Sequence, residues 1–346
     1  MIASLESWTD NPPDDWDATI CRLGGSIFHS CLWAEYRQQS GNIQPIFLLG
    51  RDAGGEACAG AVAFFQRSPW PIASLIFRTL TLPAHPVVRG GDDAAEAFIG
   101  QIEDRGRALG CSRIVLESFM SGESAFVPED FGYRGASRLE FHLDLGRDPD
   151  SLWKGIGKDQ RDKIRRLSRE GVVIEEGRAR DDIRGLGVVR EATQAKRTAR
   201  GQHYDLSAGD DFYERLFEYL VARGAGRLFL ARRDGEVIAG LFFSTFNGHA
   251  YSVFSGSTDQ GYRLGAQSGI FWAAVETFRA EGFALLNRGG VPGSAAEEGD
   301  PQHGIYVFKK RLGTTPVLCR SGAKVLSPVR DQLTRMRDRL RESVLA

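Results

Sequence analysis

The chain has 346 residues, of which 42% are hydrophobic and 26% charged, with a net charge of −1. This length suits two domains of roughly 150 residues, and the composition is that of an ordinary globular protein. No apolar run approaches the roughly 18 residues that span a bilayer, and segment 1–17 lacks the basic start and apolar stretch of a signal peptide, so we expect a cytoplasmic protein without a membrane span.

The first half of the chain alternates between helices and strands. A Gly24-Gly25 turn precedes a helical stripe of apolar residues, and the segment 51–55 has the composition of a hairpin turn. Gly110 ends the longest helix of this half, whose inward residues are expected to be Ala95, Phe98, Ile99 and Ile102. The predicted elements are helices over 27–39 and 92–109 and strands over 45–49, 59–66, 113–117 and 140–145.

The second half begins after a polar turn, Gly146–Asp150, where we expect a domain boundary. Asp150-Ser151 is typical of a helix start, and Asp234-Gly235 and Asn247-Gly248 are strong hairpin signals within an antiparallel meander. The predicted elements are helices over 151–170, 182–197, 210–223, 266–281 and 327–344 and strands over 172–175, 227–232, 237–246, 249–255 and 284–286. Both halves share the order helix, strand hairpin, helix and buried strand, which favours a duplicated module.

The charge is unevenly distributed. Residues 1–150 hold 12 Lys and Arg against 21 Asp and Glu, whereas residues 151–346 hold 32 against 24. A basic second half suits an anionic partner, although two domains that differ only in surface composition give the same asymmetry. Many of the basic residues fall in the helix predicted over 151–170. Its spacing places four of them near one face, which either binds phosphates or is simply solvated: Lys158, Arg161, Arg165 and Arg169.

Several familiar catalytic and metal-binding patterns are missing from the sequence. The five cysteines are odd in number and none are spaced as a C-x-x-C pair, so we expect neither disulfides nor a zinc site. There is no phosphate-binding loop, no G-x-G-x-x-G after a strand, no H-E-x-x-H and no G-x-S-x-G. Nucleotide hydrolysis, hydride transfer, zinc proteolysis and serine hydrolysis therefore lose support.

Two further segments could carry chemistry. Arg200 and Tyr204 form a polar cluster in a predicted loop, where the planar guanidinium fits a phosphate or carboxylate, but an ordinary capped loop has the same composition. Lys309 lies in the apolar run Gly304–Gly313, behind the glycine-rich loop 289–304. An ammonium at the floor of a pocket can stabilise an oxyanion; without further information, the same run is interpreted as the edge of a strand.

Four stretches of the second half form a recognisable series. They are Leu152-Trp153-Lys154 through Gly171-Val172, Gly265-Ala266-Gln267-Ser268-Gly269, Asn287-Arg288-Gly289-Gly290, and Gly304-Ile305 with Phe308-Lys309 and Leu312-Gly313. The last closely matches a Gly-Ile…Phe-Lys…Phe-Gly signature, and the third an Asp-x-Gly-Gly turn. The series resembles the FemAB/FemX aminoacyltransferase family and the related acetyltransferase domain of the GNAT superfamily. The first half resembles it more loosely, through Phe28-His29-Ser30, Trp33 and Gly41.

The resemblance implies an α/β (α+β) protein of two tandem GNAT-like lobes with a cleft between them. The first lobe would be 1–146, with a C-terminal helix over 314–346 packed on it, and the second, catalytic lobe 147–313. The implied reaction transfers an aminoacyl group from aminoacyl-tRNA to an amine of a peptidoglycan precursor or of another acceptor, UDP-linked or small. Aminoacyl-tRNA would be a co-substrate, and no resident cofactor or metal is implied. The sequence names neither donor amino acid, acceptor nor oligomeric state.

The resemblance also assigns residues. Lys309 would stabilise the tetrahedral oxyanion, and Phe308 would shape the pocket beside it. The residues assigned to the substrate are Arg37, for the diphosphate of the precursor; Arg200 and Tyr204, for the same group, with Arg197 as a rival; and Tyr251, for the acceptor site.

The sequence departs from the family pattern, and two other functions stay open. Asn287 replaces the usual Asp, and Arg37 replaces the commoner Lys. The main alternative is an acyl-CoA-dependent N-acyltransferase, whose Gln/Arg-x-x-Gly-x-Gly/Ala loop holds a pyrophosphate at a helix N-terminus. The stretch Tyr262–Gln267 has Gly in the fourth place but Gln in the sixth. The second alternative is a non-catalytic binding protein of the same fold.

Overall fold

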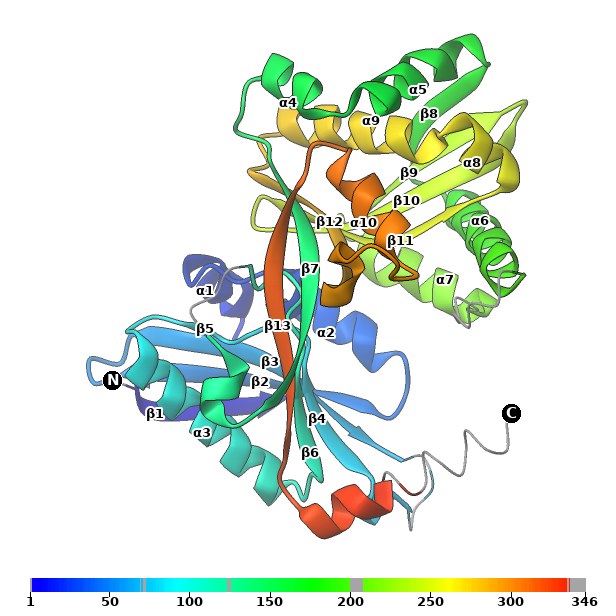
Figure 1. Cartoon of the computed structure of the whole chain (residues 1–346). Coiled ribbons are helices and arrows are strands. Elements are labelled where there is room, and N and C mark those ends of the chain that lie inside the picture. The colour runs from blue at the N-terminus through cyan, green and yellow to red at the C-terminus, as the bar shows by residue number, and fades with distance from the viewer. Residues whose placement is uncertain are drawn as a thin grey trace. The chain divides into compact units, whose positions relative to one another are not determined.

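The computed structural model describes residues 2–68, 70, 73–122, 126–199, 208–334 and 336. The chain forms two compact units, one of residues 1–138 with 318–346 and one of residues 139–317 (Figure 1). The sequence led us to expect domain boundaries after residues 146 and 313, whereas the structure divides the chain after residues 138 and 317. Two strands, β7 (Arg134–Asp144) and β13 (Thr315–Val325), run from one unit into the other.

The first unit is built on a sheet in the order β1-β2-β3-β4-β6-β13, with β5 paired to β3. Its elements are β1 (Ile2–Thr9), α1 (Trp16–Arg22), η1 (Ile27–His29), α2 (Cys31–Gln38), β2 (Ile43–Asp52), β3 (Ala57–Arg67), η2 (Ala73–Leu75), β4 (Arg78–Leu82), β5 (Val87–Val88), α3 (Asp92–Ala108), β6 (Arg113–Leu116) and η3 (Pro128–Phe131). Helix α3 connects β4 to β6, which run parallel. As predicted, Phe98, Ile99 and Ile102 of α3 are buried, whereas Ala94 is the small residue that faces inward, rather than Ala95.

The second unit has a sheet in the order β7-β12-β11-β10-β9-β8. Its elements are α4 (Pro149–Gly155), α5 (Lys158–Arg169), β8 (Val172–Gly177), α6 (Arg180–Thr198), α7 (Asp210–Leu216), the π-helical turn η4 (Phe217–Val221), β9 (Gly226–Arg233), β10 (Glu236–Phe246), β11 (His249–Ser257), α8 (Asp259–Leu264), α9 (Ala266–Ala280), β12 (Leu285–Pro292), η5 (Gly293–Ala296) and α10 (His303–Lys310). The predicted meander of β9, β10 and β11 is confirmed. All four residues of its two turns have positive φ, which Asn-Gly and Asp-Gly pairs tolerate.

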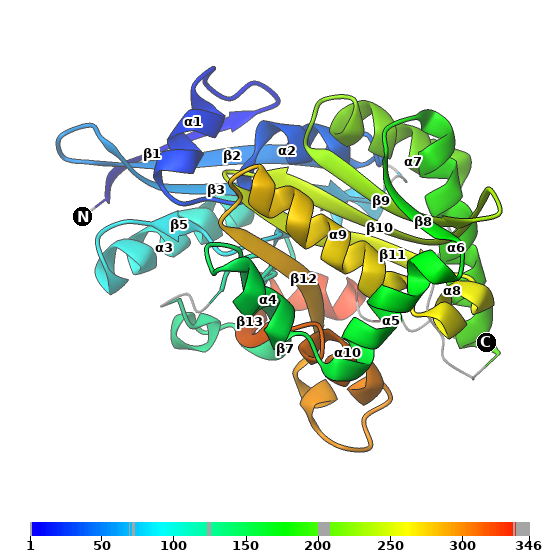
Figure 2. The ribbon, with the colours of Figure 1, turned by 90° about the horizontal axis from the view of Figure 1, so that it is seen from above.

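Helices cover both faces of the strand β10. Helix α9 lies along β9 to β11 (Figure 2) and packs its apolar face, including Phe271 and Phe278, on Leu241 and Phe243. Helix α6 packs on the other face, where Gly240 allows Leu186 to approach. Because neither face meets water, β10 is apolar along almost its whole length and shows no alternation.

The parallel pairing of β11 with β12 is short. It comprises three residue pairs and ends where Tyr251 meets Asn287. Both strands continue beyond this point, β11 to Ser257 and β12 to Pro292. In the first unit, β4 and β6 form the same kind of short parallel pair, and the connection contains a long helix in both units, α3 in the first and α9 in the second. The repeated order of elements that the sequence predicted is therefore present in both units.

The basic helix predicted over 151–170 is two helices. Ile156 adopts an extended conformation between α4 and α5, and the N–H of Gly157 donates to the carbonyl of Arg311 at 2.8 Å. The Arg161 guanidinium donates to the carbonyl of Lys154 at 2.9 Å and to the carbonyl of Ile156. These bonds satisfy carbonyls at the C-terminal end of α4. Asp148, rather than Asp150 or Ser151, is the N-cap residue of α4.

Three other predictions of local structure were wrong. Segment 304–313 is not a strand edge, because residues up to Lys310 form helix α10, whose partly buried Phe308 packs on the core of the second unit. Segment 314–346 does not begin as a helix, because β13 pairs with β6 along 322–325; in the described part, helix follows over 328–334 and at 336. Segment 27–39 is divided by Ser30, which caps α2 through a bond from the N–H of Trp33.

The described residues add three observations on membranes, thiols and metals. None of their helices combines the length and the apolar character needed to cross a bilayer. The five cysteines are free thiols. Within the same part of the chain, His, Cys, Asp and Glu side chains do not gather in sets of three that could hold a metal ion.

The contact between α6 and β11 can be tested at Gly256. A Cβ atom there would lie 2.5 Å from the backbone carbonyl of Val189 in α6, which cannot move away as a side chain tip can. We expect Gly256→Ala to lower the free energy of unfolding by about 2 kcal/mol or more in urea denaturation. Gly304→Ala is the control, because its Cβ would meet nothing within 4 Å. Equal stability of the two variants would contradict this packing.

Candidate functional site

Lys309 lies in the last turn of α10 and is 8% exposed. Its Nζ donates a hydrogen bond to the carbonyl of Gly290 at 3.0 Å and lies 5.4 Å from the centre of the Phe141 ring. A buried ammonium is unfavourable unless it is hydrogen-bonded and compensated. The carbonyl and the aromatic face supply part of that compensation, and they hold the charge inside the second unit.

The carbonyl that Lys309 contacts belongs to a tight turn within β12. Gly289 has a φ of +74°, and its N–H donates to Asn287 Oδ1 at 2.9 Å. A Cβ on Gly289 would lie 2.9 Å from the Ser252 carbonyl oxygen, so only glycine fits this position without displacing β11. The turn therefore aims the Gly290 carbonyl at Lys309.

A buried carboxylate lies on the other side of this turn. Glu140, on β7, is fully buried. It accepts a hydrogen bond from Asn287 Nδ2 at 2.6 Å and one from the Tyr251 hydroxyl at 3.2 Å. His142 Nε2 is 3.6 Å from the same carboxylate and 3.0 Å from Asn287 Nδ2. Tyr251, assigned by resemblance to the acceptor site, is thus buried and bonded to Glu140.

Arg288, on β12, bonds to β11 at the point where these two strands separate. It is 5% exposed and donates to Ser252 Oγ at 2.9 Å and to Gln267 Oε1 at 3.0 Å. Gln267 in turn donates to the carbonyls of Gly240 and Gly256, both at 2.9 Å. Burial lowers the pKa of Arg288 to about 10, so the guanidinium remains charged at neutral pH. Its Nε has no hydrogen-bond partner among the described residues, and none of them forms an ion pair with it.

Arg37 is the predicted substrate residue of the first unit. It lies on α2, half-buried, with its guanidinium 5.8 Å from the centre of the Phe64 ring. Its buried Nε bonds to no described residue, and burial lowers the pKa of the side chain. A partly desolvated arginine in this condition would gain from an anionic partner.

The other predicted residues lie on different elements. Phe308 lies on α10 and packs against the core of the second unit. Arg197 is half-buried near the end of α6. Arg200 and Tyr204 fall outside the described residues. The structure thus brings Lys309 and Tyr251 together through Asn287 and Glu140.

Sequence reasoning missed most of the side chains that organise this site. Glu140 was treated only as part of a strand, and Asn287 only as a departure from a motif. Arg288, Ser252 and Gln267 received no role. The available signal was Glu140 itself, a charged residue between the apolar Leu139 and Phe141; a charged residue is buried only when it has partners.

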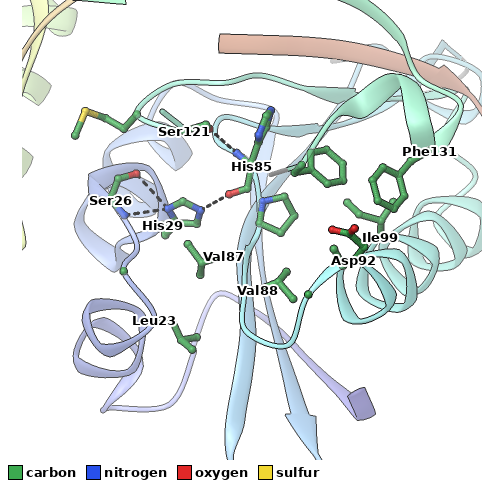
Figure 3. A pocket seen from close by; sticks show the side chains of 16 residues that line it. Leu23, Ser26, His29, His85, Val87, Val88, Asp92, Ile99, Ser121 and Phe131 are labelled. Carbon is green, nitrogen blue, oxygen red and sulfur yellow. Dashed lines mark hydrogen bonds between the residues drawn. The ribbon is translucent and has the colours of Figure 1, made fainter. Parts of the chain in front are cut away.

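The first unit contains a separate pocket of about 300 Å³ at the ends of β4 and β6 and the start of α3 (Figure 3). His29 borders it. The Ser26 N–H donates to His29 Nδ1 at 3.2 Å, so the ring proton resides on Nε2 and is donated to the His85 carbonyl at 2.9 Å. Burial lowers the pKa of His29 to about 4. This imidazole is neutral and fully engaged, and no predicted site residue lines the pocket.

Comparison with known families places a domain in the second unit. Residues 157–302 match the family model described as acetyltransferase (GNAT) domain. The matched range lies entirely within the second unit. The Asn287–Gly290 turn lies within the matched range and Lys309 just beyond it. No curated protein matches the chain by sequence.

Solved structures resemble the chain over nearly its whole length. FemX has a TM-score of 0.72 at 14% identity, covering 95% of this chain and 99% of that one. The C-terminal domain (DUF2156) of a putative lysylphosphatidylglycerol synthetase from Agrobacterium fabrum has a TM-score of 0.57 at 16% identity, covering 89% and 90%. A tandem GNAT protein from the clavulanic acid biosynthesis pathway has a TM-score of 0.55 at 15% identity, covering 94% and 99%. The expected FemX-like, tandem GNAT fold is confirmed, and fold and domain together support an acyltransferase.

The neutral state of His29 predicts how stability changes with pH. Its pKa is about 4 in the folded protein and about 6.5 when unfolded. Between these values the unfolded chain binds a proton that the folded chain excludes, so stability falls as the pH falls. From pH 7 to pH 5 we expect urea denaturation to show a loss of about 2 kcal/mol from this group. His29→Gln should lack that part of the loss; equal losses in both proteins would contradict the assignment.

Proposed function

We propose that the protein transfers an aminoacyl group from aminoacyl-tRNA to an amine, with Lys309 at the reacting centre. The acceptor would be a peptidoglycan precursor or another small amine, UDP-linked or free, and no resident cofactor would take part. The observation that carries the proposal is the buried Lys309 ammonium, held on the Gly289-Gly290 turn of the unit that matches a GNAT domain, in a chain with a FemX-like fold.

The reaction is acyl transfer to nitrogen. The lone pair of the acceptor amine attacks the carbonyl carbon of the aminoacyl ester, and a C–N bond forms. The carbonyl oxygen carries negative charge in the tetrahedral intermediate. The C–O bond to the ribose then breaks, and the proton lost by nitrogen ends on the released ribose hydroxyl. Lys309 would stabilise the negative oxygen, because a fixed positive charge away from water acts strongly there.

The chemistry does not need a strong base. An aminoacyl ester is already activated, so holding the amine and the carbonyl in contact supplies much of the acceleration. Tyr251 and Glu140 are bonded to each other inside the unit, which suits a role in shaping the site. Phe308 is the neighbour of Lys309 in α10 and packs on the core, so it would help to hold the ammonium on the inner side of that helix.

Helix α5 supports a polyanionic donor. Several of its basic residues pair with acids, such as Arg165 with Asp162 at 3.5 Å. Lys158 and Arg169 are exposed and form no ion pair with any described residue. Exposed lysines and arginines without acidic partners are the groups that bind nucleic-acid phosphates. This fits the acceptor end of a tRNA.

Acyl-CoA is the second candidate donor, favoured by the match to an acetyltransferase domain. Against it, two positions of the expected pyrophosphate loop serve other contacts. Tyr262 lies under the Lys196 ammonium, with 4.4 Å between Nζ and the ring centre, and Gln267 is turned inward to Gly240 and Gly256. Neither side chain is of the type that the motif uses.

Arg37 supports an anionic group on the acceptor. Its guanidinium is half-buried and its Nε bonds to no described residue. A diphosphate would supply the missing acceptor atoms in a charge-assisted bond. We propose this role for Arg37 in the first unit, and a matching one for Arg197 in the second.

Replacement of Lys309 tests the catalytic proposal. Lys309→Ala should lower kcat for transfer to amines about 100- to 1,000-fold, because oxyanion stabilisation is lost. Lys310→Ala is the matched control, since Lys310 is exposed at the next position. Products from a panel of UDP-linked and small amines are measured by mass spectrometry, with charged tRNA in one arm and acyl-CoA in the other.

Each outcome of that experiment distinguishes the candidates. Turnover with charged tRNA alone supports the proposal, and turnover with acyl-CoA alone favours the second donor. Undiminished turnover by Lys309→Ala would refute the role of Lys309. Ligand binding without turnover in the wild type would favour a binding protein of the same fold.

The salt dependence of tRNA binding tests helix α5. Removing one phosphate-binding side chain should reduce the slope of log K against log salt by about one. We therefore expect the double variant Lys158→Ala/Arg169→Ala to bind charged tRNA more weakly, with a slope about two smaller. Arg184→Ala is the control, because Arg184 already pairs with Asp181 and Glu214. A slope that is unchanged in the double variant would exclude α5 from the tRNA interface.

A further inference from the structure

Glu140 and Asn287 form a buried pair that leads directly to Lys309. Neither side chain has any measurable exposure, and Asn287 Nδ2 lies 2.6 Å from Glu140 Oε2. The Tyr251 hydroxyl occupies the other carboxylate oxygen at 3.2 Å. Each oxygen of the Glu140 carboxylate therefore accepts one hydrogen bond. Glu140 lies on β7, and the two donor residues lie on β11 and β12.

These contacts determine the orientation of the Asn287 amide. Glu140 can only be approached by a donor, so the amide nitrogen must face it. The amide oxygen then faces the Gly289 N–H and accepts its hydrogen bond at 2.9 Å. This second bond holds the backbone in the positive-φ turn that presents the Gly290 carbonyl to Lys309 Nζ at 3.0 Å.

The geometry points to Glu140 and Asn287 as positioning residues for the Lys309 ammonium. Glu140 orients the Asn287 amide, Asn287 fixes the Gly289 turn, and the turn places the carbonyl that holds Lys309. The inference rests on the proposed function, in which Lys309 is the group that meets the developing negative charge. Neither Glu140 nor Asn287 needs to touch the substrate.

The pair also explains why the sequence has Asn where the family pattern has Asp. An aspartate at position 287 would place a carboxylate oxygen next to Glu140, where the Asn287 nitrogen now lies 2.6 Å away. Two buried carboxylates at this distance repel and must share a proton. Glu140 and Asn287 are thus complementary: a carboxylate at one position requires an amide at the other.

This complementarity allows the two roles to be exchanged. In the double variant Glu140→Gln/Asn287→Asp, the amide of residue 140 can donate to the carboxylate of residue 287. The oxygen of that amide can still accept the Tyr251 hydroxyl, and the carboxylate can still accept the Gly289 N–H. The same hydrogen-bonded path to Lys309 is rebuilt with the charge on the other strand.

The experiment measures amine transfer by the two single variants and by the exchange variant. We expect Asn287→Asp and Glu140→Gln each to lower kcat about 10- to 100-fold with little change in KM, since a displaced catalytic group lowers the rate of the bound complex. The exchange variant should recover most of kcat. In a Lys309→Ala background, Asn287→Asp should lower the rate no further. Glu276→Gln, an exposed charge removal on α9, is the control.

A second measurement reports the position of Lys309 without turnover. Acetic anhydride labels exposed lysines, and the extent of labelling at Lys309 is read by peptide mass spectrometry. Lys309 should be protected in the wild type, labelled faster in both single variants, and protected again in the exchange variant. A loss of folding that was unrelated to Lys309 would instead also raise the labelling of the partly buried Lys163, Lys196 and Lys324, and would not be reversed by the exchange.

The outcomes separate this inference from the proposed function. If no acyl donor gives turnover but the labelling pattern holds, the proposed function fails and the positioning stands. If Lys309→Ala lowers kcat but the single variants do not, or if their effects multiply with that of Lys309→Ala, the positioning fails. Unchanged labelling of Lys309 in the single variants, or no recovery in the exchange variant, would also overturn it.

Discussion

The parallel pairing of β11 and β12 ends at Tyr251 and Asn287, and the chemistry of the second unit depends on this end point. Gly289, two residues beyond this end point, has a φ of +74°, which departs from the conformation of a regular strand although β12 continues to Pro292. Where a ladder stops, backbone and side-chain groups need other partners. The Asn287 amide, the Arg288 guanidinium and the Lys309 ammonium provide them.

Buried positive charges outnumber buried negative charges around this end point. Arg288 is buried on neutral partners, Ser252 and Gln267, and no described acid pairs with it. Lys309 adds a second buried cation close to the same turn, whereas Glu140 supplies one carboxylate. The N-terminus of α9, where Gln267 lies, adds the positive end of a helix dipole. A site of this composition favours negative charge, and under the proposed function that charge would develop on the oxygen of the tetrahedral intermediate.

Local signals predicted the parts of this arrangement that depend on neighbours in sequence. The turns at Asp234-Gly235 and Asn247-Gly248, the long helix α9 and the buried residues of α3 could all be inferred, because turn chemistry and apolar periodicity act over a few residues. The break between α4 and α5 could not, since it needs a bond from Gly157 to Arg311. The Glu140–Asn287 contact joins residues 147 positions apart, and no local pattern encodes such a pairing.

The two units share a topology but place different chemistry at corresponding points. In the first unit, the parallel pair β4 and β6 ends at Leu82 and Leu116, both apolar. The side chains nearby include Ser118, which bonds to Ser321, His29, which burial keeps uncharged, and the acidic Glu117, which directly follows Leu116. The second unit has cations and a carboxylate in the same topological place. Because the backbone arrangement is common to both units, the difference lies in the side chains: among the described residues, the second unit has the buried cations Arg288 and Lys309 at this point, and under the proposed function these cations would stabilise a developing anion.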